Sequence, residues 1–222
     1  MERFECWELD GHILAGIAGD EYVIDTGSPQ TYLLGDTLKL GNHDYEGHPQ
    51  PDGFMDILHR NVSPGVAGLI GLDAMSNYDV SISLKERSIE FHADSFALPG
   101  GTDLPVIRGG GTFPHIAVLG PGGRPIDAIL DLGARFSYLA ISDAETNFGS
   151  AWDFWPVNSG PERFPVRLYD VNLTIAGQKH SFTAGNREDV PGLPDVEIIG
   201  SEILKYFDIN IALRRNLVEL RA

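Results

Sequence analysis

The chain has 222 residues, with 32 acidic residues against 16 Lys and Arg, and a formal net charge of −16. Such an acidic surface repels phosphate backbones, which argues against nucleic acid as a partner. The hydrophobic share of 42% is ordinary for a globular protein, and 26 Gly with 14 Pro favour short strands and tight turns over long helices.

The sequence carries no obvious targeting signal. Cys6 is the only cysteine, so no disulfide can form within the chain. No apolar run is long enough to cross a membrane. The N-terminal residues have neither an apolar run nor a small-residue cleavage site. We therefore expect a cytoplasmic protein that does not bind membranes.

The first half of the chain predicts two hairpins and a strand that ends in an aspartate motif. Residues 4–17 surround an Asp-Gly turn, which is typical of a β hairpin. A short apolar strand then leads to the motif at 25–28. Residues 73–77 have room for one or two helical turns. Residues 81–91 form a second hairpin, whose apolar residues alternate as in a half-buried strand.

A Gly- and Pro-rich bridge at 99–114 separates this half from a second half that repeats it. Residues 195–220 align without a gap on residues 66–91, and apolar positions match apolar positions. Upstream, residues 127–140 align in the same way on residues 21–34. Two blocks that keep their register and their order indicate a duplicated unit.

The duplication predicts an all-β, bilobed fold with short helices. Its pseudo-twofold-related lobes would be residues 1–99 and 100–222. Equivalent residues of such lobes face each other across the axis, as in an isologous dimer. Asp25 and Asp131 are equivalent, so we expect their carboxylates to meet.

Two close carboxylates are suited to acid–base chemistry. Both cannot ionise easily, so one pKa rises and the pair holds one proton over an acidic range. One oxygen can take a proton from water while another gives one to a carbonyl oxygen, which hydrolyses a peptide bond without a covalent intermediate. Gly27 is expected to let the backbone turn sharply after the strand, and the small residue after it can donate a hydrogen bond to the carboxylate.

These motifs resemble those of the pepsin/retropepsin group of aspartic proteases. The residues that carry the resemblance are Asp25-Thr26-Gly27-Ser28, Asp131-Leu132-Gly133-Ala134, Leu69-Ile70-Gly71 and Ile198-Ile199-Gly200. The resemblance spans nearly the whole chain and implies a compact, single-chain acid-protease fold. It implies that Asp25 and Asp131 are catalytic and that the other residues of their motifs support them. It also implies a peptide or protein substrate, no cofactor, no metal and a monomer, since one chain supplies both aspartates.

The second motif departs from the family pattern. The family usually has Thr or Ser after each catalytic Asp, and the two hydroxyls bond across the axis. Thr26 fits this pattern, but Leu132 has no hydroxyl.

The substrate-covering flap of the family also has no standard counterpart. The second half is longer in its middle, so a flap is expected from residues 147–167. Its Trp152, Phe154 and Trp155 are candidates for substrate contact, although at least one is expected in the core. In the shorter first-half loop, Tyr45 is the candidate flap tyrosine.

Other polar residues are given structural roles. A cluster of His and Asp at 43–52 matches no tight metal motif, so we predict a solvated loop. Asp79 and Asp208 are matched acidic residues at strand starts, which favours a shared turn or cap. Two functions remain open: an aspartic endopeptidase, which both motif aspartates favour, and a catalytically weak, protease-like module that binds a peptide or protein, which Leu132 favours.

Overall fold

The computed structural model describes residues 1–106, 113–141, 147–154, 163–193 and 195–222. Strands dominate these ranges, and the α-helices within them are short. The predicted all-β class is therefore confirmed. None of the described helices is long and apolar enough to cross a membrane.

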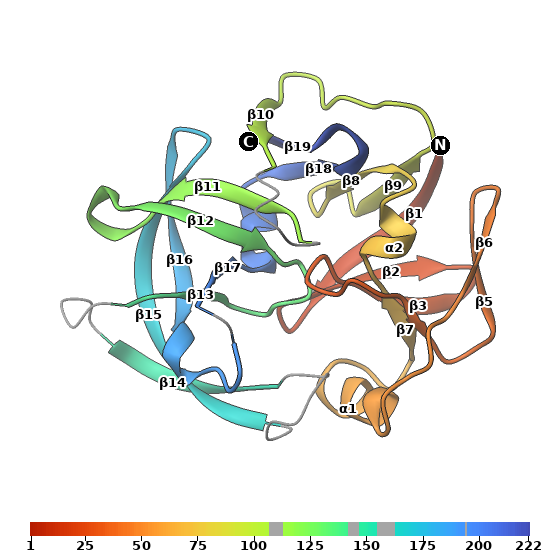
Figure 1. Ribbon diagram of the computed structural model, residues 1–222, viewed down its shortest axis with the longest axis horizontal. Coiled ribbons are helices and arrows are strands. Elements are labelled where there is room, and N and C mark those ends of the chain that lie inside the picture. Colours follow the sequence, from red (N-terminus) through yellow and green to blue (C-terminus); the bar gives the residue numbers. More distant parts are fainter. Residues whose placement is uncertain (107–112, 142–146, 155–162, 194) are drawn as a thin grey trace.

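Two sheets contain nearly all the strands of the described chain (Figure 1). The larger sheet has, in spatial order, β10 (Thr102–Pro105), β19 (Leu217–Arg221), β18 (Asp208–Ala212), β8 (Asp79–Ser83), β9 (Ser88–His92), β1 (Glu2–Leu9), β2 (His12–Ile17), β3 (Asp20–Ile24), β7 (Val66–Ile70) and β4 (Tyr32–Leu33). The smaller sheet has β11 (His115–Leu119), β12 (Pro125–Leu130), β17 (Glu197–Ile199), β13 (Ser137–Leu139), β16 (Gln178–Asn186), β15 (Arg163–Ile175) and β14 (Asn147–Phe154). The other elements are β5 (Thr37–Leu40), β6 (His43–Glu46), α1 (Phe54–Asn61), α2 (Leu72–Met75) and the 3-10 turns η1 (Pro121–Gly123), η2 (Arg187–Asp189), η3 (Ser201–Lys205) and η4 (Leu213–Arg215).

The same arrangement of strands occurs once in each sheet. In the larger sheet, β3 is parallel to β7, and β7 is antiparallel to β4. In the smaller sheet, β12 is parallel to β17, and β17 is antiparallel to β13. The hairpin partners β2 and β11 flank β3 and β12 in the same way. The repeat in the sequence thus appears as a repeated topology.

Equivalent hydrogen bonds fix the two aspartate loops to the strands beside them. The Asp25 amide donates to the Ile70 carbonyl at 3.0 Å. The Asp131 amide donates in the same way to the Ile199 carbonyl at 2.9 Å. Both acceptors belong to the apolar-apolar-Gly elements, which therefore support the loops that carry the aspartates.

A second pair of bonds ties the glycine of each element to a hydroxyl. The Gly71 amide donates to the Thr31 hydroxyl oxygen at 3.0 Å. In the other copy, the Gly200 amide donates to the Ser137 hydroxyl oxygen at 3.1 Å. Buried amides need such partners, so a small hydroxyl residue six positions after each aspartate is part of the repeated unit.

The last hairpins of the two halves lie side by side in the larger sheet. Strand β8 pairs antiparallel with β18, with Ile82 opposite Ile209 and Val80 opposite Ile211. Strands β18, β19 and β10 thus extend a sheet that otherwise comes from the first 99 residues. One sheet therefore takes strands from both sides of the predicted boundary, and the division at residues 99 and 100 stays a prediction.

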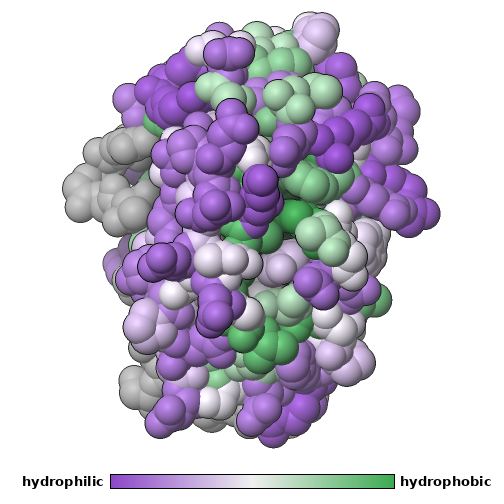
Figure 2. Space-filling model, turned by 90° about the vertical axis from the view of Figure 1, so that its right-hand side faces the viewer, coloured by the Kyte–Doolittle hydropathy of each residue, from purple (hydrophilic) through white to green (hydrophobic). Residues whose placement is uncertain are grey.

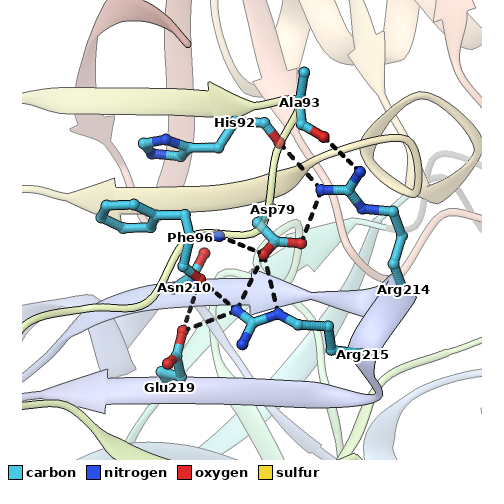
Figure 3. A network of polar contacts seen from close by, with 8 residues as sticks. All are labelled: Asp79, His92, Ala93, Phe96, Asn210, Arg214, Arg215 and Glu219. Carbon is cyan, nitrogen blue, oxygen red and sulfur yellow. Dashed lines mark hydrogen bonds and ion pairs between the residues drawn. The ribbon is translucent and has the colours of Figure 1, made fainter.

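A polar network secures this junction (Figure 3). Asp79, at the start of β8, is fully buried. Its carboxylate accepts hydrogen bonds from Arg214 (3.1 Å), Arg215 (3.1 Å) and the Phe96 amide (2.9 Å). Glu219 of β19 is a second partner for Arg215, at 3.3 Å. These contacts agree with the structural role predicted for Asp79.

Helix α1 begins where the predicted first-half loop ends, and the sequence analysis did not predict it. Its Phe54, Met55 and Leu58 are buried. They belong to one cluster with Val23 and Leu69 of the larger sheet. One apolar stripe is enough to seat so short a helix on a sheet.

The face of the protein on the β5–β6 side is mostly hydrophilic, with hydrophobic residues gathered near its middle (Figure 2).

Candidate active site

Asp25 directly follows β3, which is parallel to β7, and Asp131 directly follows β12, which is parallel to β17. Their carboxyls lie close together, because each occupies the place where a Cβ on the motif glycine of the other loop would lie. Asp131 is 7% exposed, and Asp25 is half-buried. The structure thus brings together the two residues that the sequence analysis selected as a pair.

Backbone amides of each loop point at these carboxyls. The Gly27 amide donates to Asp25 Oδ1 at 2.8 Å. The Gly133 and Ala134 amides donate to Asp131 Oδ1 at 2.9 and 3.1 Å. Such bonds favour the charged form of a carboxyl and hold its orientation.

The two carboxyls perturb each other's titration. Burial raises the pKa of both Asp25 and Asp131, and the charge of Asp131 raises the pKa of Asp25 further. Close carboxyls of this kind share a proton over part of the acidic range. One member can then donate a proton while the other accepts one, which is the requirement for general acid–base hydrolysis.

The motif glycines are required by close approach rather than by a turn. Gly27 and Gly133 lie in turns, as expected, but neither has a positive φ, so the turn itself does not require glycine. A Cβ on Gly27 would lie 2.2 Å from the Asp131 carboxylate, and one on Gly133 would lie 2.3 Å from Asp25 Cγ. Each glycine therefore leaves room for the aspartate of the other half.

The hydroxyls at positions 26 and 28 have different partners. The fully buried Thr26 hydroxyl donates to the Leu130 carbonyl at 2.6 Å and accepts from the Leu132 amide at 2.9 Å. It thus links the two aspartate loops, although the Leu132 side chain contributes no hydroxyl. The Ser28 hydroxyl donates instead to the Gln30 carbonyl, at 2.7 Å.

Replacement of Thr26 by Val is expected to destabilise the protein by about 1–3 kcal/mol. The isosteric side chain removes the acceptor of the buried Leu132 amide, and an unsatisfied buried donor costs about this much. Chemical denaturation measures the change, and Thr26→Ser, which keeps the hydroxyl, is the matched control. Equal stability of Thr26→Val and the parent would contradict the role of this bond.

A cleft of about 330 Å³ opens over the two carboxyls. Residues of both sheets and of helix α1 line it, and many of them are apolar. Among these are Val23, Leu58, Leu69, Tyr138 and Phe154. A volume of this order is enough for a side chain or a small ligand.

The four flap candidates are placed differently. Phe154 lines the cleft, and its ring centroid lies 5.3 Å from that of His12. Trp152 is 57% exposed and does not line the cleft. Tyr45 packs against the main core and is also absent from the cleft lining. Trp155 lies outside the described residues.

Several polar residues of the cleft, among them His12, Tyr138 and Asp153, were not predicted from the sequence. His12 opens strand β2, and its Nδ1 lies 3.1 Å from the Gly133 carbonyl oxygen. Tyr138 donates a hydrogen bond from its hydroxyl to Asp153, and both line the cleft. The alignment of residues 127–140 on 21–34 pairs Tyr138 with Tyr32, and both tyrosines line the cleft. This repeated tyrosine could have indicated a cleft residue from the sequence alone.

The described residues contain no group of three or more His, Cys, Asp or Glu side chains that could hold a metal ion. His48 of the 43–52 cluster instead pairs with Asp73, at 3.1 Å. The Thr31 hydroxyl and amide also donate to this Asp73 carboxylate. His48 and Asp73 thus form part of a local network behind the first aspartate loop.

No protein-family model matches this chain. No curated protein matches it either.

Proposed function

We propose that this protein is an aspartic endopeptidase in which Asp25 and Asp131 activate a water molecule for attack on a peptide bond. The observation that carries the proposal is the meeting of these two carboxyls at equivalent strand ends, at the floor of a cleft. The raised pKa of both carboxyls supports a shared proton. One carboxyl then protonates the carbonyl oxygen, and the other takes a proton from water.

The proposal includes a bilobed acid-protease fold of the pepsin/retropepsin type. Its support is the strand arrangement that occurs in both sheets, with the aspartates at matched positions. The proposed lobes are residues 1–99 and 100–222. A monomer is sufficient because one chain supplies both aspartates, and we place the protein in the cytoplasm.

The proposed cover of the active site is the hairpin of β14 and β15. These strands pair from Asn147 to Phe154, and Phe154 reaches the cleft and the His12 ring. No residue of the β5–β6 hairpin lines the cleft. This supports a flap from the second half rather than from the loop that holds Tyr45.

A defined peptide pool, incubated with the protein from acid to neutral pH, tests the proposal. Mass spectrometry should detect internal cleavage that is strongest at acidic pH and that a pepstatin-type inhibitor suppresses. The inhibitor separates this activity from contaminating proteases of other classes. Absence of cleavage at every pH, with peptide binding retained, would reject the endopeptidase proposal.

That outcome would support a second candidate, a protease-like module that binds a peptide or protein. The observation in its favour is Leu132, whose fully buried side chain leaves one of the two cross-axis hydroxyls missing. The Thr26 hydroxyl still bonds to the second aspartate loop, but the matching hydroxyl bond from position 132 is missing. A dyad held less rigidly loses catalytic precision, since small displacements of reacting groups are costly to rate.

A further inference from the structure

A third carboxyl lies in the cleft and has no role in the proposed hydrolysis. Asp153, near the end of β14, is 5% exposed and lines the same cleft as the dyad. One of its oxygens accepts from the Tyr138 hydroxyl, and the other accepts from the Phe154 amide at 2.9 Å. Both donors are neutral, so neither supplies a positive charge.

The nearest positive groups are engaged elsewhere. Arg135 also lines the cleft, but its guanidinium pairs with Asp10 at 2.7 Å and covers the Phe136 ring at 5.0 Å. Burial lowers the pKa of His12, which favours a neutral ring. Within the described part of the chain, Asp153 forms no ion pair. Burial raises the pKa of Asp153, although the Tyr138 hydroxyl, the Phe154 amide and the Arg135 charge lower it, so the cleft by itself favours the neutral acid. A cation bound beside this carboxyl would favour its charged form.

The rest of the cleft suits the stem of a long basic side chain. Its walls near the dyad are apolar, as Val23, Leu58, Leu69 and Phe154 illustrate. Lys and Arg bury their methylene stems along apolar surface and keep the charged end on a polar partner. A charge-assisted hydrogen bond to a carboxylate is about twice as strong as a neutral one.

We propose that Asp153 makes this cleft select a substrate with a Lys or Arg side chain, whose cationic end binds the Asp153 carboxylate. Tyr138 is then a positioning residue, because its hydroxyl fixes the carboxylate toward the cleft. A substrate cation in the cleft supplies the ion pair that Asp153 lacks among the described residues. The inference rests on the proposed function for its peptide substrate.

The test compares peptides that differ at one position only. Starting from a peptide that the parent cleaves, Lys is introduced at each position in turn, and norleucine provides the uncharged match. At one position, kcat/KM should be about ten- to a hundredfold higher for Lys than for norleucine, the range of a hydrogen bond to a charged group. Asp153→Asn should remove this preference, whereas Asp170→Asn, an exposed change in β15 beyond its pairing with β14, should keep it.

Binding separates this inference from the endopeptidase proposal. Fluorescence anisotropy of the labelled peptides with Asp25→Asn, in which cleavage is blocked, should show the same preference for Lys as a lower Kd. A protein that cleaves nothing but binds Lys peptides selectively would reject the proposed function and retain the inference. Equal affinity and equal kcat/KM for Lys and norleucine at every position in the parent would overturn it. A preference that persists in folded Asp153→Asn would also overturn it.

Discussion

Replacement of Asp25 by Asn is expected to lower peptide cleavage by about a hundred- to ten-thousandfold, the usual contribution of general acid–base catalysis. The amide cannot exchange a proton with water or with a carbonyl oxygen. It still accepts the bond from the Gly27 amide, which now lies 2.8 Å from the carboxylate. Steady-state kinetics should therefore show a fall in kcat with little change in KM.

The matched control is Asp20→Asn. Asp20 opens the same strand β3 and is exposed, so this change removes the same charge five residues away. Cleavage by Asp20→Asn should equal that of the parent. An Asp25→Asn protein that retains more than about a tenth of the parent rate would count against a catalytic dyad, because the loss expected from removing such a group is at least a hundredfold.

The same variant should change how stability depends on pH. The pKa of Asp25 is raised in the folded protein, so the folded state holds this proton more tightly than the unfolded chain does. As pH rises from the ordinary carboxyl pKa of about 4 to that raised value, the parent loses stability. The unfolding free energy of Asp25→Asn should fall less over this interval in urea titrations. Parallel curves for the two proteins would contradict the raised pKa.

Replacement of Asp79 by Ala is expected to destabilise the protein by about 3–5 kcal/mol, the cost of breaking a buried ion pair from one side. The fully buried carboxylate is the common partner of Arg214, Arg215 and the Phe96 amide (Figure 3). Its loss leaves that amide without an acceptor and both guanidinium groups without their shared anion. Urea denaturation measures the difference in unfolding free energy.

The duplication supplies a matched control at Asp208. This residue occupies the equivalent position in the second half, but among the described residues its one ion pair is with Arg221 of its own hairpin, at 2.7 Å. Because the Asp208 carboxylate is 14% exposed and that of Asp79 is fully buried, Asp208→Ala should cost about 1 kcal/mol or less. Equal losses for the two variants would contradict the view that Asp79 holds the halves together.

The sequence was sufficient to find Asp25 and Asp131 because their equivalence follows from the repeat alone. The reason for glycine at positions 27 and 133 could not be found in the same way. A local pattern indicates a turn, whereas the true constraint is a carboxyl of the other half that occupies the place of a Cβ. Contacts between halves are visible only after folding.

Residues brought to the cleft by distant strands were equally hidden. Asp153 lies in a segment whose aromatic residues were the candidates for substrate contact. The residues beside it in the sequence do not indicate that its carboxyl is buried. In the folded protein, the end of β14 lines the cleft, and this brings Asp153 beside Tyr138. Helix α1 was missed for a different reason, since its apolar stripe consists of Phe54, Met55 and Leu58 in only eight residues.

The pairing of β8 with β18 also bears on how such a chain avoids aggregation. Without β18, strand β8 would end the first-half sheet with a row of unpaired amides and carbonyls, which is a template for association with other chains. The register of Val80 and Ile82 against Ile211 and Ile209 covers that row from within the same molecule. Covalent linkage of the two halves keeps this cover at a high local concentration. The C-terminal hairpin therefore covers a sheet edge that the first half alone would expose.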